Sequence, residues 1–353
     1  MHADAKALRA AVAPFAVPST ASAVLQLLTS IGLYIAVLGL MYWSLSVSLW
    51  VTLSLAVPAA GLLVRVFIVQ HDCGHGSFVG SPRANNIIGA ICGVLTLVPY
   101  RNWRRQHAQH HSNWNNLDRR ESGADFYSAC LTVDEYRARS RSQRFFHRLL
   151  RHPLVAHVAI PPLVFLLLYR LPFDTPKHWT AERWSVYLTN ASIGALVVAL
   201  GLVCGFRAEL IVQMPITIVA TIVGVWLFSV QHRFDTSRWL RQSEWNFQTA
   251  SMESSSYLKL PRPLQWFTGN IGFHHIHHLA PRVPNYRLEA CHRASAMLHT
   301  ETPLTLKRAL GAWNLVLWDE VRQKLVRFRD AQVRAATQNG PYTKAACAGS
   351  IDK

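Results

Sequence analysis

The chain has 353 residues, of which 50% are hydrophobic, and its mean hydropathy is slightly positive. Lysine and arginine outnumber aspartate and glutamate by 36 to 19, which gives a formal net charge of +17. No zinc-finger, helix-turn-helix or RNA-binding motif accompanies this charge, so we expect no nucleic-acid partner. The six cysteines form no CxxC pair, and we expect reduced thiols rather than disulfides.

Four apolar stretches are each long enough to cross a bilayer, which takes roughly 20 helical residues. They lie in two pairs, and only a few residues join the members of each pair, which predicts two helical hairpins. Arg65 lies near the end of its stretch, where its guanidinium can reach the membrane interface. The expected spans are residues 23–45, 49–69, 186–206 and 210–230.

Two further apolar segments, residues 87–98 and 154–169, are short or broken by the Pro161-Pro162 pair, so we expect them to be interfacial. Between Arg101 and Arg151 lie eleven arginines against five acidic residues. By the positive-inside tendency this segment and both termini are cytoplasmic. We therefore expect a cytosolic segment (1–22), a membrane domain (23–314), and a basic C-terminal helix with a disordered tail (315–353).

Histidines are grouped in three short motifs, each next to an apolar stretch. HDCGH contains His71 and His75, HAQHH contains His107, His110 and His111, and FHHIHH contains His274, His277 and His278. Spacings of three and four place side chains on one face of a helix. One such pair is weak evidence of a ligand set, but three clusters on the same predicted side of the membrane indicate a shared metal site.

The ligand type is compatible with iron, zinc, copper or nickel. Zinc sites usually close at four ligands, and no cysteine stands at a useful spacing, so eight or more imidazoles indicate two ions. Acidic side chains often orient ligand imidazoles through the second ring nitrogen, although each can equally be a surface acid or helix cap. The candidates for this role are Asp72, Asp118, Asp125 and Asp235.

The motifs and their flanks resemble the membrane fatty acid desaturase family, in particular its bacterial and cyanobacterial acyl-lipid members. The similarity covers roughly residues 25–314. The stretches that carry it are HDCGHGSF, PYRNWRRQHAQHHSNWNNLD, VWLFSVQHRFD and TGNIGFHHIHHLAPRVPNYRL.

The resemblance implies an all-α integral membrane protein with four transmembrane helices under a cytosolic helical cap that holds a di-iron centre. It adds a ligand between the last span and the third motif, a position that His232 fits, and it leaves His275 outside the ligand set. Some relatives place an asparagine one turn before the extra histidine, where this chain has Phe228. The implied iron ligands are His71, His75, His107, His110, His111, His232, His274, His277 and His278.

The implied reaction is O2-dependent desaturation of a lipid acyl chain to a cis double bond, of the omega-6 (delta-12) or delta-5 type. Two iron ions supply the chemistry that side chains lack. The resemblance also implies a separate electron donor such as ferredoxin or cytochrome b5, and a bacterial inner-membrane location with the site on the cytoplasmic side. The arginine-rich face can dock an acidic donor, or it can reflect topology and lipid headgroups. The aromatic residues expected to line an apolar tunnel are Trp103, Trp226, Trp266 and Phe267.

Three alternatives remain at this point. Related motifs serve hydroxylases, epoxygenases, acetylenases and carotenoid oxygenases, so another lipid oxidation is the first alternative. A metal transporter would place its ligands within broken spans near the midplane, whereas these motifs follow the spans. A non-enzymatic lipid-binding protein would have no need of nine converging histidines.

Overall fold

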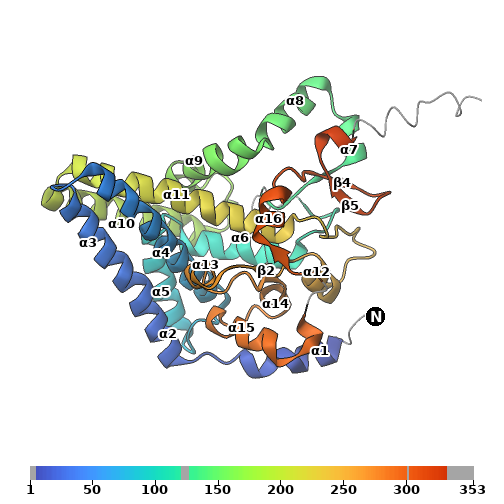
Figure 1. Ribbon diagram of the computed structural model, residues 1–353, viewed down its shortest axis with the longest axis horizontal. Coiled ribbons are helices and arrows are strands. Elements are labelled where there is room, and N and C mark those ends of the chain that lie inside the picture. Colours follow the sequence, from blue (N-terminus) through green and yellow to red (C-terminus); the bar gives the residue numbers. More distant parts are fainter. Residues whose placement is uncertain (1–4, 121–126, 300–301, 332–353) are drawn as a thin grey trace, which may run out of the picture.

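The computed structural model describes residues 5–120, 127–299 and 302–331 (Figure 1). Asp125 lies outside this described part, and so do residues 332–353, which include the expected tail. The chain begins with α1 (Ala5–Val12) and the short η1 (Ala13–Phe15), which lead into the first long apolar helix.

In the part of the chain that the structure describes, four helices are long and apolar enough to cross a membrane, and they occupy the four predicted stretches. The first, Thr20–Ser44, consists of α2 (Thr20–Leu27), one π-helical turn η2 (Leu28–Gly32) and α3 (Leu33–Ser44). The others are α4 (Leu49–His75), α10 (Thr180–Cys204) and α11 (Phe206–His232).

The second and fourth of these helices, α4 and α11, form the centre of the bundle and pack directly on each other. Small residues of α4, among them Ala59 and Ala60, are buried in this contact together with Ile216 of α11. Small side chains allow two helix backbones to approach closely. Each helix has 27 residues and is therefore roughly 40 Å long, more than the roughly 30 Å of a bilayer core. Their last turns thus extend beyond an apolar span.

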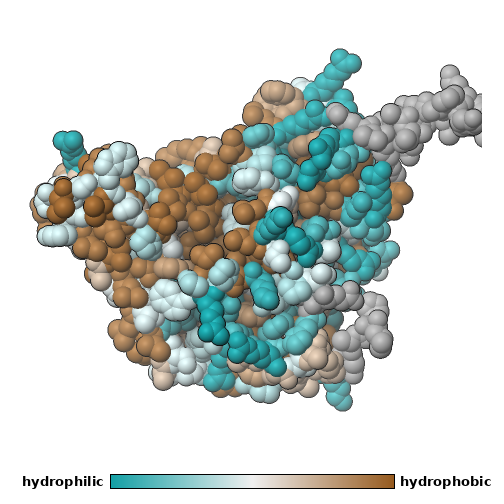
Figure 2. All heavy atoms as spheres, viewed as in Figure 1, coloured by the Kyte–Doolittle hydropathy of each residue, from teal (hydrophilic) through white to brown (hydrophobic). Residues whose placement is uncertain are grey.

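Shorter elements gather where α4 and α11 end. Figure 2 shows apolar side chains over the end that holds α3, α10 and α11, and polar side chains over the opposite end. We call that opposite end the polar end. Its main helices are α5 (Pro82–Leu95), α6 (Tyr100–Asn113), α7 (Val133–Ala138), α12 (Phe247–Glu253), α13 (Arg262–Phe267), α14 (His274–Leu279), α15 (Asn285–Ala294), η6 (Ala296–Leu298) and α16 (Leu306–Ala312).

The fold is mostly helical, but the all-α prediction missed two small sheets. Parallel β2 (Leu258–Lys259) and β3 (Leu304–Thr305) form one. The other has the order β1-β4-β5, built from β1 (Leu131–Thr132), β4 (Leu317–Asp319) and β5 (Lys324–Val326).

Where a helix was predicted from residue 315, β4 and β5 pair instead as an antiparallel hairpin, and helical structure begins only at Phe328 and continues to Ala331, the last described residue. Leu317 and Trp318 are fully buried, and Leu325 and Val326 are nearly so. Residues adjacent in each strand pack into two different hydrophobic clusters, one with Leu317 and Val326 and the other with Trp318 and Leu325. Successive side chains of a strand point to opposite faces, which allows adjacent large residues to be buried on both sides.

The two segments expected to be interfacial are helical. Residues 87–98 fall mainly in α5, which has 14 residues and is too short to count as a span. Residues 154–169 form η4 (Val155–Ala159), α9 (Ile160–Leu166) and part of η5 (Leu168–Arg170). They follow α8 (Arg141–Leu150) after a 54° bend, and counting this bent pair as a span would raise the number from four to five.

Candidate metal centre

Nine histidines from four helices meet at the polar end. The last turns of α4 and α11 carry His71, His75 and His232, which explains why these helices exceed a membrane span. Eight of the nine side chains are buried and His75 is half-buried. The remaining six come from the polar helices α6 and α14, and they are His107, His110, His111, His274, His277 and His278.

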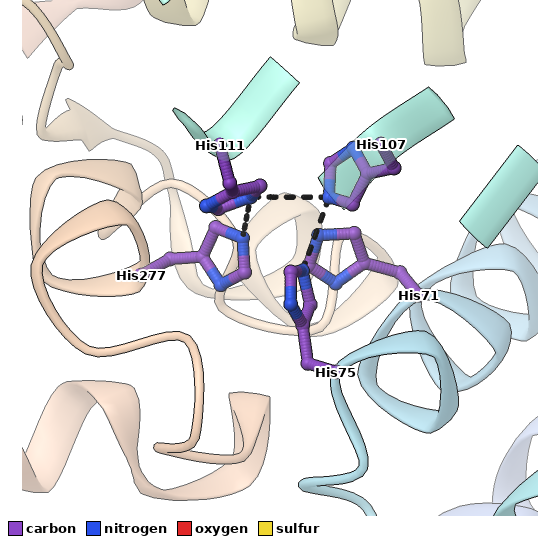
Figure 3. Close-up of side chains that lie close together, drawn as sticks. All are labelled: His71, His75, His107, His111 and His277. Carbon is purple, nitrogen blue, oxygen red and sulfur yellow. Dashed lines mark hydrogen bonds between the residues drawn. The ribbon is translucent and has the colours of Figure 1, made fainter. Parts of the chain in front are cut away.

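Five of these imidazoles form a first group, shown in Figure 3, whose ring nitrogens all lie within 4.8 Å of one another. The Nε2 atom of His107 is 3.1 Å from that of His75 and 3.1 Å from that of His111. His111 Nε2 is in turn 3.0 Å from His277 Nε2, and His71 completes the group. The rings therefore point at a common centre.

A second group lies beside the first. His110, His232 and His278 bring ring nitrogens within 4.8 Å of one another. His274 joins them, since its Nε2 is 2.9 Å from His232 Nε2 and 3.0 Å from His278 Nε2. The rings of His111 and His278 stack at 4.2 Å, so the two groups are in direct contact.

The chemistry of these nitrogens fits a bound cation. Burial, reinforced by the charges of neighbouring imidazoles, lowers the pKa of five ring systems well below 6.5; these are His107, His111, His274, His277 and His278. They are therefore neutral near pH 7, and each can offer a lone pair. Lone pairs that face one another at about 3 Å repel unless a positive charge lies between them. Imidazole is a good ligand for iron, zinc and copper.

One carboxylate orients a member of the first group. Asp72 Oδ1 accepts a hydrogen bond from His71 Nδ1 at 3.1 Å, which leaves His71 Nε2 free of a proton. Asp72 Oδ2 accepts from the backbone N–H of Asn285 at 2.6 Å and from its side-chain Nδ2 at 2.7 Å. Asn285 Oδ1 accepts from Gln26 Nε2 at 2.9 Å. Asp72 thus lies where the sequence predicted, and Asn285 and Gln26 are partners that sequence reasoning missed.

The other predicted acids do not lie at the histidines. Asp118 pairs with Arg241 at 2.7 Å and accepts from the backbone N–H of Gln242. Asp235 pairs with Arg308 at 2.7 Å. Both are neutralised by arginine at the surface of the polar end, so their prediction as imidazole partners is wrong.

Comparison with known proteins identifies the chain. The family model for fatty acid desaturases matches residues 47–303. The chain belongs to the fatty acid desaturase family. It is therefore an oxidoreductase that acts on paired donors with O2, and the histidine groups together with the family indicate iron as the metal.

The desaturase is similar to several characterised relatives. It is 44% identical to a Bacillus subtilis fatty acid desaturase over 92% of this chain and 91% of the relative. It is 28% identical to a chloroplastic temperature-sensitive sn-2 acyl-lipid omega-3 desaturase (ferredoxin) of Arabidopsis thaliana, over 66% of this chain and 54% of the relative. An endoplasmic-reticulum acyl-lipid omega-3 desaturase (cytochrome b5) of the same plant is also 28% identical, over 72% and 66% of the two chains.

An apolar cavity of about 160 Å³ lies against both histidine groups of this desaturase. His71 and His107 of the first group line it, as do His110 and His274 of the second. Between α4 and α11 its wall includes Leu63, Thr217, Thr221 and Gly224, and Phe165 and Tyr169 complete one side.

Only one of the four predicted tunnel aromatics lines this cavity. Trp103 does so, and its ring stacks on His107 at 4.6 Å. Trp226 packs into the core of the helix bundle, and the guanidinium of Arg65 lies 4.2 Å over the ring of Trp266. Phe267 fills the space above Gly61, where a Cβ would come within 2.8 Å of its ring. The prediction for these three is wrong because Trp266 and Phe267 pack α13 against α4, and Trp226 of α11 packs into the bundle core.

The structure also places two other positions that the sequence singled out, Phe228 and His275. Phe228 lines the cavity and packs against the rings of His110 and His232, at 5.1 and 5.5 Å, so an apolar ring occupies this position. The Nε2 of His275 bonds the carbonyl of Leu298 at 2.9 Å, away from both groups.

Proposed function

We propose that this desaturase uses O2 and two iron ions to introduce a cis double bond into the acyl chain of a membrane lipid. The observation that carries the proposal is the shared wall of the apolar cavity, because residues of both histidine groups line it. A saturated chain in this cavity has its methylenes next to both metal positions. Polar substrates have no matching partner along most of the wall.

Each of the two histidine groups would hold one ion. His71, His75, His107, His111 and His277 surround one position, and His110, His232, His274 and His278 surround the other. Iron supplies the oxidising power needed for an unactivated C–H bond, which no side chain provides. The reaction removes two hydrogens from adjacent methylenes and reduces O2 to two waters, with two electrons from a donor and two protons from the solvent.

The cavity wall would position the chain and exclude water. Leu63 and Val225 from the two central helices hold the chain by apolar contact, and Trp103 covers it beside His107. Fixing one methylene pair near the metals turns a difficult encounter into an oriented one. A dry wall also prevents the consumption of O2 and electrons without substrate.

We propose a separate donor, ferredoxin or cytochrome b5, because the two Arabidopsis relatives carry those donors in their names. Those names also specify acyl-lipid substrates and omega-3 products. For this chain the sequence favours the omega-6 (delta-12) or delta-5 position, and product analysis distinguishes all three.

We also propose the membrane arrangement expected from the sequence: two hairpins in the bacterial inner membrane, with the polar end as a cytosolic cap. Two observations support it. The histidines in the last turns of α4 and α11 lie at one common site, so these two helices end on the same side of the membrane. The segment between Arg101 and Arg151 is strongly basic, as cytoplasmic segments are.

The test is expression in a desaturase-deficient bacterial host, followed by gas chromatography and mass spectrometry of the membrane fatty acids. We expect a new cis-unsaturated chain with wild-type protein and none with His277→Ala, at equal membrane levels. Hydroxylated or epoxidised chains would assign another oxidation, and an unchanged profile with iron bound and a donor supplied would contradict desaturation.

A further inference from the structure

Helix α8 (Arg141–Leu150) carries an apolar face with no partner in the described part of the chain. Its Phe145 and Phe146 are 63% and 60% exposed, and Leu149 and Leu150 are exposed beside them. These four residues lie on one side of the helix, because Phe145 and Leu149, and likewise Phe146 and Leu150, are four positions apart. Figure 1 shows α8 projecting from the body of the molecule beyond α9.

The opposite side of α8 faces the protein. Arg148 Nε donates to the hydroxyl of Tyr136 at 2.5 Å, and the ring of His147 lies 5.7 Å from that of Phe328. Ser140 caps the helix through a capping box with Gln143, so its first turn is well formed. The helix is therefore held in place with its apolar side outward, and this outward face requires an explanation.

The charge around this face is strongly one-sided. Six arginines lie between residues 137 and 151, and no aspartate or glutamate occurs from residue 136 to residue 173. Among the described residues no carboxylate pairs with Arg141, which lies one turn before Phe145, or with Arg144, which lies one turn before Arg148. Arginines next to exposed phenylalanine and leucine are typical of helices that lie in a lipid headgroup layer.

Continuity with the apolar bundle supports lipid as the occupant of this face. After the 54° bend the chain continues into η4 and α9, both of which contact α11. Exposed apolar side chains continue along this path, at Leu154, Leu163 and Leu167. A band of exposed leucines thus leads from the membrane-spanning helices to the face of α8.

We propose that α8 lies in the headgroup layer of the leaflet next to the metal centre, where its arginines bind anionic phospholipid and its phenylalanines enter the acyl boundary. The bent pair is then an interfacial anchor and not a fifth span. Because α9 contributes Phe165 to the cavity wall, the anchor fixes this wall relative to the acyl chains of the leaflet. The proposal holds whichever oxidation the enzyme performs.

Cysteine accessibility tests the proposal. In nanodiscs, Phe146→Cys is compared with Val321→Cys, a 70% exposed position in the turn between β4 and β5. A water-soluble maleimide labels each variant, and wild-type labelling is subtracted. The described natural cysteines give a low background, since four are buried and Cys204 is half-buried.

In nanodiscs of phosphatidylcholine mixed with phosphatidylglycerol, Phe146→Cys should label about ten-fold more slowly than Val321→Cys. Phosphatidylcholine alone should reduce this protection, and so should the Arg141→Gln/Arg144→Gln double variant in the mixed lipid. Equal labelling at the two positions in the mixed lipid would overturn the proposal. Protection that depends on protein concentration and not on lipid would assign the face to a second copy of this chain. Equal protection in both lipid compositions would contradict the binding of anionic phospholipid by α8.

Discussion

Asn285 holds the carboxylate of Asp72 through two hydrogen bonds, although 213 residues separate them in the chain. Asp72 in turn accepts the Nδ1 proton of His71, so the amide of Asn285 acts on the first histidine group through one carboxylate. Partners of this kind fix the tautomer and the ring orientation of a metal ligand.

Replacing Asn285 by aspartate should therefore weaken metal binding. The new carboxylate would repel Asp72 and withdraw the Nδ2 donor, and His71 would lose its fixed orientation. We expect iron affinity to fall about ten-fold or more, as is usual when such a partner is lost. Asn116→Ala is the control, since Asn116 is also buried but bonds Gln242. Iron titration measures the affinity of both variants. Unchanged iron affinity in Asn285→Asp would contradict an orienting role for Asn285.

Gly224→Leu should block substrate binding without disturbing the fold. Gly224 lines the cavity, and a Cβ there meets no atom within 4 Å, so the leucine side chain would extend into the space proposed for the acyl chain. Gly194 on α10 is equally open but lines no described cavity, which makes Gly194→Leu the matched control. Product formation should fall at least about ten-fold in the first variant only. Equal activity in the two variants would place the substrate elsewhere.

Within the third motif, His275→Gln and His278→Gln should behave oppositely. His278 belongs to the second group, whereas His275 bonds the carbonyl of Leu298. Loss of His278 should therefore lower the iron content, and loss of His275 should lower the melting temperature while the iron content stays. Metal analysis of the two purified proteins separates these effects. Iron loss in His275→Gln alone would reverse the assignment.

Acidification should destabilise the metal-free protein. Burial lowers the pKa of His275 from 6.5 to about 4, so this ring stays neutral in the folded chain over a range where the unfolded chain takes up a proton. The free energy of unfolding must then fall as pH drops from 6.5 towards about 4, by about 1.4 kcal/mol for each pKa unit. Thermal melts across this range should show the decrease, with a smaller slope in His275→Gln. A flat profile would contradict the neutral buried state.

Several features could be predicted because they depend on local pattern. Apolar runs predicted the four long helices, since span length follows from bilayer thickness. The spacing of the histidine motifs predicted that their rings share a face. Asp72 is adjacent to its partner His71, so proximity along the chain was sufficient.

Other features depend on contacts between distant segments. Asp118 and Asp235 carry the same charge as Asp72, but distant arginines, Arg241 and Arg308, determine their positions. Neither motif nor periodicity reveals that Asn285 reaches Asp72. The β4–β5 hairpin was missed because its short strands are stabilised by burial of Trp318 and Leu325 against residues from elsewhere.

Metal counting shows whether the two histidine groups hold two iron ions. The purified protein would be titrated anaerobically with ferrous iron, and iron and protein would be quantified together after removal of excess metal. We expect saturation at one ion for each of the two groups, hence two per chain. Saturation at a single ion per chain, or retention of zinc in place of iron, would contradict it.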